Sequence, residues 1–444
     1  MLDGLGEYCA EVLAEHDCPS VSVAVAERGK VVLAEAYGLA DMAAGRPATP
    51  GTAYVLASIT KPMTATAVCV AADEGLLDLD APVPGEFAWP APTLRQLLWH
   101  RGGFGAHYDF QYGDGVDGRT IDADRYAVLY REPGSGFEYA NLGYRALGQA
   151  LEAASGQELG KFVRERVFEP LGLKGCRLGA TYTGAGDSAV PYSIDGRPYP
   201  QRRTSHPGAT LGWADAGELA VFAQSYERLL KPATALAVRD ALPINGRLGY
   251  GLGWCVSYGG GGPVVQSHGG RMGGVAVMVA AVPEQQLSVA VLTNSTGSTA
   301  RDAIVRHVLG ALVPGYTDEL ISPVLDDPER PVELPEGAWA GRISTPEGDV
   351  PVELRLLADR RVELRLDGKT ATGPAVASEA WDLRLALPLQ LPTADARVNS
   401  PLLALGLRLG EGRLTGVACA HKDGDRGGWL GNFLSHRCEL RPAP

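Results

Sequence analysis

The first seventy residues alternate between apolar runs and short polar turns. Residues 3–16 place apolar side chains at helical spacing, which predicts a short amphipathic helix. Two runs rich in valine and alanine, 20–26 and 30–38, flank the turn Glu27–Gly29 and predict an antiparallel hairpin. The alanine-rich run from Val55 to Val68 is apolar on all sides, which is typical of a buried helix.

The middle of the chain has helical periodicity. Helical segments are expected at 93–99, 122–131, 142–154, 158–168 and 214–231. Residues 106–120 combine aspartates, glycines and aromatic residues, which is typical of a surface loop that could line a cleft, and 180–208 is a polar connection rich in glycine and proline. This portion therefore interrupts the sheet that the first hairpin begins.

Strand patterns return after residue 260. The runs 263–268, 274–282 and 287–293 are rich in β-branched residues, with a turn at 283–286, and 298–312 predicts a closing helix. A hairpin, a helical insert, three antiparallel strands and a last helix together predict an α/β (α+β) domain, with an antiparallel sheet flanked by helices.

The last quarter of the chain has a different pattern. After a proline-rich acidic segment, alternating apolar and polar positions predict hairpins at 350–366 and 403–419. An antiparallel β-barrel or sandwich of about seven or eight short strands is the natural interpretation. We therefore expect a catalytic domain over 1–315, a linker over 316–334 and a C-terminal barrel over 335–444.

Composition narrows the function. The chain has 444 residues, 45% of them hydrophobic, and a formal charge of −12, which argues against binding nucleic acid or an anionic membrane. The first residues lack a basic and apolar leader, and no apolar run of about 18 residues occurs, so neither a signal peptide nor a spanning helix is expected. Seven scattered cysteines suggest reduced, buried thiols and a cytoplasmic protein.

Ser58 and Lys61 are the first candidate for chemistry. They lie one helical turn apart at the start of the apolar run, so their side chains share a face. A desolvated lysine amine can take the proton of a serine hydroxyl and make it a nucleophile. The alternative is that Ser58 only caps a core helix and Lys61 is a solvated residue of its first turn.

Tyr139, Asn141 and His268 are the second group of candidates. A lysine ammonium could hold the Tyr139 phenol as phenolate, which would make it a general base. Asn141 could bind Lys61 or a substrate carbonyl, or it could be only the N-cap of the helix at 142–154. His268 begins a His-x-Gly pattern that also occurs elsewhere, but it alone ends a predicted strand, from which it would face the cleft.

With these motifs in this order, the chain resembles the serine β-lactamase and penicillin-binding-protein superfamily, and in particular its class C β-lactamase-like branch. The resemblance covers residues 5–313. It implies a transpeptidase-type fold in which Ser58 is the acylated nucleophile and Lys61 its proton partner. Tyr139 would be the base that also protonates the leaving group, and Asn141 would bind substrate and Lys61.

The resemblance also suggests how the rest of the site is built. His268 would stand where the family has Lys or His before a glycine, with Gly269 and Gly270 beside the substrate. An oxyanion hole would use the N–H of Ser58 and one near Gly274 or Val275. The third motif is His-Gly-Gly rather than Lys-Thr-Gly, which in this family is commoner among esterases and peptidases.

We therefore expect a serine hydrolase or acyltransferase that forms an acyl-Ser58 intermediate from an ester, amide or peptide. The substrate would be a small-molecule or peptidyl acyl compound, free or carrier-bound, and no metal, cofactor, nucleic acid or membrane is expected. One alternative is a penicillin-binding-protein-type thioesterase that cyclises nonribosomal peptides, because those proteins also carry a lipocalin-like barrel. The other is a non-catalytic scaffold with the same fold.

Overall fold

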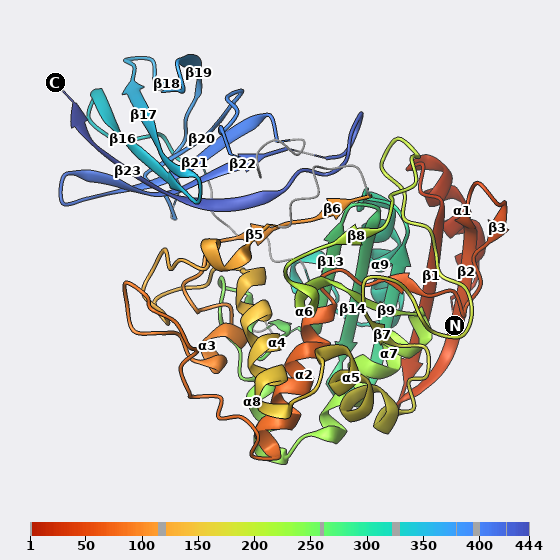
Figure 1. Ribbon diagram of the computed structural model, residues 1–444. Helices are drawn as coiled ribbons and strands as arrows, with labels where there is room; N and C mark the ends of the chain where they lie inside the picture. Colours follow the sequence, from red (N-terminus) through yellow and green to blue (C-terminus); the bar gives the residue numbers. More distant parts are fainter. Residues whose placement is uncertain are drawn as a thin grey trace.

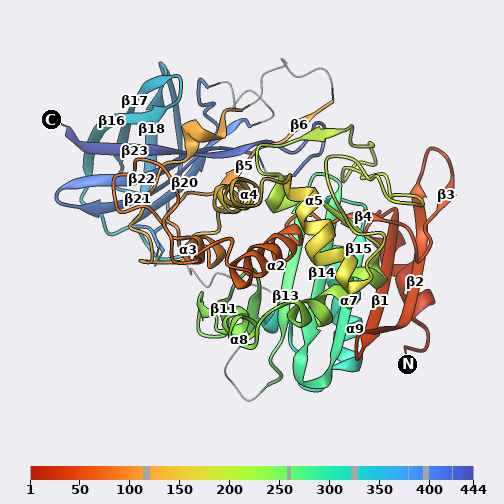
Figure 2. The same ribbon diagram turned by 60° about the horizontal axis from the view of Figure 1, so that its bottom comes forward.

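The computed structural model has two parts, an α/β body and a curled β-sheet that lies against one side of it (Figures 1 and 2). It describes residues 2–113, 121–257, 262–321, 329–378, 380–393, 400–422 and 424–443. The body is formed by the first three quarters of the chain. The curled sheet is formed by the last quarter.

A nine-stranded antiparallel sheet is the centre of the body. Its order is β10-β11-β12-β13-β14-β15-β1-β2-β3, so the first hairpin joins the later strands through β1 and β15, as the sequence predicts. Valine and alanine fill β14, all eight residues of which are buried, because helices cover both faces of the sheet. The strand bounds are β1 Ser20–Glu27, β2 Lys30–Asp41, β3 Arg46–Pro47, β10 Leu242–Pro243, β11 Leu248–Tyr250, β12 Cys255–Ser257, β13 Gln266–Met272, β14 Val275–Val282 and β15 Leu287–Thr293.

Helices cover the two faces of the sheet in separate layers. The helices α1 (Leu5–Glu15) and α9 (Thr299–Leu312) pack together on one face, while α7 (Ala216–Ser225) packs on the other. The remaining helices extend the second layer, in which α2 (Thr60–Asp73) is almost entirely buried. They are α3 Leu94–Leu98, α4 Asn141–Ser155, α5 Leu159–Val163, α6 Pro207–Thr210 and α8 Pro232–Arg239.

Short strands connect the helical insert to its surroundings. Three of them form a small sheet in the order β4 (Tyr54–Val55), β9 (Gly212–Ala214) and β7 (Arg177–Leu178). Of these, β4 precedes the Ser58 turn in the chain. A two-stranded ribbon pairs β6 (Gln111–Tyr112) with β8 (Arg202–Arg203). These pairings hold the loops of the insert against the edge of the central sheet.

The helix predicted at 122–131 is wrong. Only a 3-10 turn, η1 (Ala123–Tyr126), forms there, and Leu129 instead bridges to Phe104 in extended conformation. The segment 158–168 is α5 followed by a π-helical turn, and 214–231 is α7 followed by a 3-10 turn. Part of the loop expected at 106–120 forms β5 (His107–Tyr108) and β6, while 114–120 lie outside the described residues.

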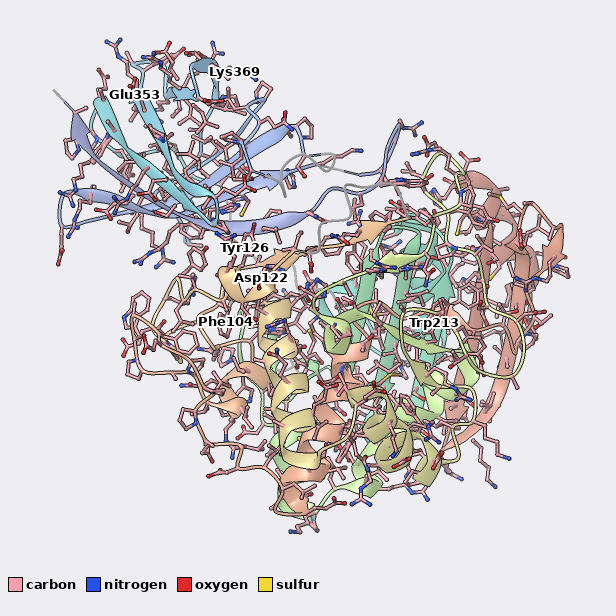
Figure 3. The ribbon with its side chains drawn as sticks, viewed as in Figure 1. Phe104, Asp122, Tyr126, Trp213, Glu353 and Lys369 are labelled. Atoms are coloured by element: carbon pink, nitrogen blue, oxygen red, sulfur yellow. The ribbon has the colours of Figure 1, made fainter. Side chains whose placement is uncertain are left out.

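Eight strands form the C-terminal sheet, as expected. Their order, β19-β18-β17-β16-β23-β22-β21-β20, is antiparallel throughout, and the sheet curls into a nearly closed barrel (Figure 1). Inward positions form one leucine-rich core, while Glu353 and Lys369 face outward (Figure 3). The strands are β16 Gly337–Thr345, β17 Gly348–Leu356, β18 Arg361–Leu366, β19 Lys369–Pro374, β20 Leu383–Leu387, β21 Leu402–Gly410, β22 Arg413–His421 and β23 Phe433–Ala443.

The barrel is joined to the body by backbone pairing. β5 pairs with the start of β23, with Tyr108 opposite Phe433 and His107 opposite Leu434. Beside it the Ser435 hydroxyl donates to the Ala106 carbonyl at 2.8 Å. The expected boundaries at 315 and 335 stay a prediction, because residues 322–328 of the predicted linker lie outside the described residues.

Two sequence-based expectations concern the whole chain. All seven cysteines are buried and none forms a disulfide in the structure, in line with the reduced thiols that the sequence predicts. Within the described part of the chain, no helix combines the length and the apolarity that crossing a membrane requires.

The barrel core generates a stability prediction. Leu364 is fully buried in β18 and its neighbour Arg365 is exposed, as the alternation of a strand requires. Leu364→Ala should lower the free energy of unfolding by about 2–5 kcal/mol, because it leaves a cavity, while Arg365→Ala should change it by about 0.5 kcal/mol or less. Urea unfolding of the full chain measures both, and equal effects would contradict the assigned faces.

Candidate active site

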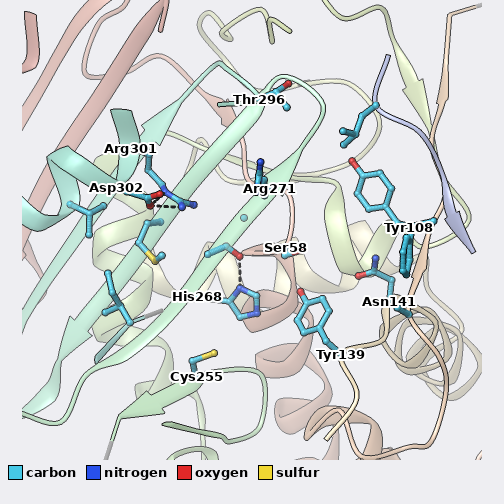
Figure 4. Close-up of a pocket in the computed structure, with 18 of the residues that line it drawn as sticks. Ser58, Tyr108, Tyr139, Asn141, Cys255, His268, Arg271, Thr296, Arg301 and Asp302 are labelled. Carbon is cyan, nitrogen blue, oxygen red and sulfur yellow. Dashed lines mark hydrogen bonds and ion pairs between the residues drawn. The ribbon is translucent and has the colours of Figure 1, made fainter. Parts of the chain in front are cut away.

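A cavity of about 910 Å³ lies where the body meets the barrel (Figure 4). Six of the residues expected at the site line it: Ser58, Tyr139, Asn141, His268, Gly269 and Gly270. The segment between β22 and β23 supplies part of its wall, through His421, Lys422, Gly424, Leu430, Gly431 and Phe433. The C-terminal part of the chain therefore forms one side of the cavity.

Ser58 lies in a tight turn directly before α2. The helix begins at Thr60, its N-cap is Ile59, and no side chain caps it, so the interpretation of Ser58 as a helix cap is wrong. The preceding residue, Ala57, is fully buried with φ +45°, a left-handed conformation that costs an alanine about 1–2 kcal/mol. This strained turn places the serine at the cavity, and such strain is concentrated at functional sites.

The Lys61 amine is the most enclosed polar group of the site. The residue is fully buried, and Nζ lies 2.7 Å from Asn141 Oδ1 and 3.2 Å from the Ala209 carbonyl, both acceptors, and 3.2 Å from Ser58 Oγ. Burial lowers the pKa of Lys61 well below its usual range. The alternative of a solvated first-turn lysine is wrong, and the amine can accept a proton from Ser58.

Asn141 holds Lys61 in place. It is the first residue of α4, whose N-cap is Ala140, and no side chain caps that helix, so Asn141 is not the predicted N-cap. Its amide instead bridges two segments, since Nδ2 donates to the His107 carbonyl at 2.6 Å while Oδ1 accepts from Lys61. The amide orientation is thereby fixed.

Tyr139 lies between His268 and Asn141, close to Ser58 (Figure 4). Lys61 Nζ is 4.6 Å from the centre of its ring. Burial raises the pKa of the Tyr139 phenol, and a hydrogen bond with Ser58 opposes that rise only in part. Burial therefore favours the neutral phenol over the expected phenolate, and it also favours the neutral amine of Lys61.

His268 is neutral and fully hydrogen-bonded. It lies inside β13 rather than at a strand end, and burial, followed by the Lys61 charge, lowers its pKa to about 3. Nδ1 is 2.7 Å from the Gly269 carbonyl, which can only accept, so Nδ1 carries the proton. Nε2 then accepts from Tyr250 Oη at 2.9 Å. The ring has no proton left to exchange with Ser58.

Glycines let β13 approach the serine turn. A Cβ on Gly270 would lie 2.2 Å from the carbonyl oxygen of Leu56, two residues before Ser58. The expected oxyanion donors Gly274 and Val275 do not line the cavity, and the Gly274 N–H donates instead to Thr296 Oγ1 at 2.6 Å. Residues 269–271 of β13 do line the cavity, so their backbone is the candidate for a second donor beside the Ser58 N–H.

Sequence reasoning missed two residues that position this site. His100 has φ +56°, its Nδ1 accepts from the Ala140 N–H at 3.1 Å, and its ring lies 4.2 Å from that of Tyr139. Tyr250 holds the His268 ring. The signal at His100 was its place after the leucines of residues 97–98, whereas nothing in the pattern singles out Tyr250.

One group in the described part of the chain has the ligand types of a metal site. His107, Asp109 and His206 are buried, with one possible ligand atom from each lying within 4.8 Å of the others. Asp109 Oδ1 lies 2.9 Å from His206 Nε2 and 3.4 Å from His107 Nε2 and accepts from Ser205 Oγ at 2.9 Å, whereas His107 Nδ1 has no hydrogen-bond partner among the described residues. Burial opposes ionisation of Asp109, but hydrogen bonds from both histidines outweigh it and lower its pKa. The Asp109 carboxylate is thus held by its neighbours, Ser205 and the two histidines.

Fold and site together define the class of this protein: an antiparallel sheet with a helical insert that brings a Ser-x-x-Lys and a Tyr-x-Asn motif into one cavity. The family model described as Beta-lactamase matches residues 6–312, and the chain belongs to this family. The match covers the body and stops before the barrel.

Three similar proteins place the chain further. Esterase EstB of Burkholderia gladioli is 36% identical over 217 residues, which is 43% of this chain and 54% of the esterase. A D-aminopeptidase of Brucella anthropi is 28% identical over 187 residues, 40% of this chain and 36% of that enzyme. The match to this chain thus spans about half of the length of the esterase and a smaller part of the D-aminopeptidase. The octameric penicillin-binding protein homologue from Pyrococcus abyssi shares the fold over 98% of this chain and 99% of its own, with a TM-score of 0.61 and 23% identity.

The buried amine generates a pH prediction. Only neutral Lys61 can take the Ser58 proton, so the rate at which a fluorophosphonate labels Ser58 should rise about tenfold per pH unit below the lysine pKa. It should level off well below pH 10.5, the usual lysine value, because burial lowers that pKa. Lys61→Arg should abolish the rise, and Lys231→Arg, at an exposed lysine, should leave it intact. A rise that continues to pH 10.5 would contradict the assignment.

His100 generates a second prediction. His100→Phe removes the acceptor for the Ala140 N–H and, as a bulky residue, fits the left-handed backbone poorly, so labelling of Ser58 should slow about tenfold or more. His100→Asn keeps an acceptor oxygen near the position of Nδ1 and tolerates the same backbone, and it should retain most of the rate. Stopped-flow labelling of both variants tests this, and equal rates would remove His100 from the site.

Proposed function

We propose that this protein is a serine hydrolase that cleaves esters through an acyl-Ser58 intermediate. The observation that carries the proposal is a contact between the buried Lys61 amine and the hydroxyl of Ser58, which lies at the cavity and does not cap the helix. Such an arrangement has no structural use as a helix cap or surface ion pair, and it provides the base that a serine nucleophile needs.

Acylation follows from the neutral pair Lys61 and Tyr139. Lys61 accepts the hydroxyl proton while Ser58 Oγ bonds to the substrate carbonyl carbon. The carbonyl oxygen becomes an oxyanion, which the Ser58 N–H and a β13 N–H stabilise. As the bond to the leaving alcohol breaks, the proton passes from Lys61 through the Tyr139 hydroxyl to the leaving oxygen.

Deacylation reverses these roles. A water molecule attacks the acyl carbon and gives its proton to the same Lys61–Tyr139 pair. The bond to Ser58 Oγ then breaks, Oγ recovers a proton, and a carboxylic acid leaves. His268 contributes by position, because its two ring nitrogens are bonded to Gly269 and Tyr250.

The esterase relative, at 36% identity, favours an ester as the substrate. Amides and peptides remain within the same chemistry, and a relative named D-aminopeptidase points in that direction. The peptide-cyclising thioesterase stays a prediction. It would form the same acyl-Ser58 and differ only in using an amine of the acyl chain in place of water.

Mass spectrometry after incubation with a fluorophosphonate tests the acylation site. The intact protein should gain one phosphonyl group on Ser58 as fluoride leaves, and Ser58→Ala should gain none. Ser135→Ala, in an exposed turn, should label as wild type does. Tyr139→Phe should slow labelling about 100-fold, because it removes the proton relay. If wild type gains no adduct, the protein is a scaffold and the proposal fails.

Product analysis separates hydrolysis from aminolysis. A peptidyl p-nitrophenyl ester with a free amino terminus should yield the linear acid, because water is the proposed acceptor. Liquid chromatography with mass detection distinguishes this acid from a macrolactam, which is lighter by one water. A macrolactam as the main product would replace the hydrolase by a cyclase while leaving acyl-Ser58 in place.

A further inference from the structure

Asp425 belongs to the segment between β22 and β23, yet its carboxylate is fully buried against the body. It accepts hydrogen bonds from Thr296 Oγ1, from Tyr199 Oη at 2.7 Å and from the Ile194 N–H at 3.0 Å. All three donors are neutral, and Arg197 nearby donates to the Asp425 main-chain carbonyl instead. A carboxylate is expensive to bury on neutral donors alone, so this arrangement calls for an explanation.

The Thr296 hydroxyl connects Asp425 to the backbone of Gly274. A hydroxyl has one proton to donate. Thr296 gives it to Asp425 and accepts from the Gly274 N–H at 2.6 Å. Gly274 forms the turn between β13 and β14 with φ +75°, where a Cβ would lie 2.3 Å from Pro191. Asp425 therefore holds the turn that ends the strand facing Ser58.

A second branch reaches the wall of the cavity. Tyr199 Oη donates to Asp425 and accepts from the Leu430 N–H at 3.1 Å. Leu430 and Thr296 both line the cavity that contains Ser58. One carboxylate thus fixes the β13–β14 turn and the wall that the C-terminal segment provides.

We propose that Asp425 is a positioning residue through which the C-terminal domain completes the active site. Its carboxylate, acting through Thr296, sets the β13–β14 turn and so the backbone donors of β13 relative to Ser58. The role of the cavity rests on the proposed function. The placement of the turn does not, because it follows from hydrogen bonds alone.

The neighbouring Asp195 provides a matched control. It also joins body and C-terminal segment, since Oδ2 accepts from the Gly427 N–H at 3.0 Å, and it pairs with Arg197. It has no bond to Thr296 or Tyr199 among the described contacts. Asp195→Asn therefore weakens the same domain contact without touching the connection to Gly274.

The experiment compares full-length Asp425→Asn, Thr296→Val, the double variant and Asp195→Asn. Hydrogen exchange of the peptide that contains residues 272–275 should speed up about tenfold in the first two, because the Gly274 amide loses its fixed acceptor. Labelling of Ser58 by fluorophosphonate should slow about tenfold in both. The double variant should be no worse than the worse single variant, and Asp195→Asn should stay within about twofold of wild type.

Three outcomes would overturn the proposal: exchange at 272–275 unchanged in Asp425→Asn, additive losses in the double variant, or an equal loss in Asp195→Asn. Should Asp425→Asn not fold, Thr296→Val and Thr296→Ser decide, because serine restores the hydroxyl and should restore both readouts. If the wild-type protein gains no adduct, only the proposed function is contradicted. Exchange at the turn still tests Asp425 in that case.

Discussion

The enclosure of the Lys61 amine is the constraint on which the rest of the site depends. An amine without solvent must find acceptors or lose its proton, and here both happen. Its three hydrogen-bond partners come from the Ser58 turn, from Asn141 on α4 and from Ala209 on α6. These elements are far apart in sequence and must converge within about 3 Å of one atom. The helical insert provides that convergence, and the proposed activation of Ser58 depends on it.

Further hydrogen bonds hold these acceptors from behind. The His107 carbonyl fixes the amide of Asn141, and Asp109 joins His107 to His206, which directly precedes α6. The cluster of His107, Asp109 and His206 thus connects β5, whose His107 carbonyl holds Asn141, to α6, whose Ala209 carbonyl contacts Lys61. A buried network of hydrogen bonds of this kind restricts the movement of the segments that it joins. Its position explains why so polar a cluster is retained beside the cavity.

Local sequence patterns predicted many of the strands and the Ser58–Lys61 pair. The features that were not predicted depend on contacts between distant parts of the chain. Ser58 and Lys61 were accessible from sequence because one helical turn relates them, and β1, β14 and β15 because valine and alanine fill them. The helix predicted at 122–131 has helical periodicity but does not form, and Leu129 instead bridges to Phe104. The expected phenolate form of Tyr139 left out burial, which sequence does not reveal and which raises the pKa of the phenol. Tyr250 was missed because only the folded chain brings it to His268.

The C-terminal barrel contributes to the cavity through residues at its edge, and its interior is filled by side chains. Its inward side chains form one packed leucine-rich core, unlike barrels that enclose a ligand. Residues between β22 and β23 extend from it to the cavity, and β5 pairs with β23 beside His107, the residue whose carbonyl holds Asn141. A displacement of the barrel would therefore be felt both at the wall of the cavity and at the acceptors of Lys61. The cavity lies at the junction of the two parts, so the family match over residues 6–312 does not include the part of its wall that residues between β22 and β23 supply.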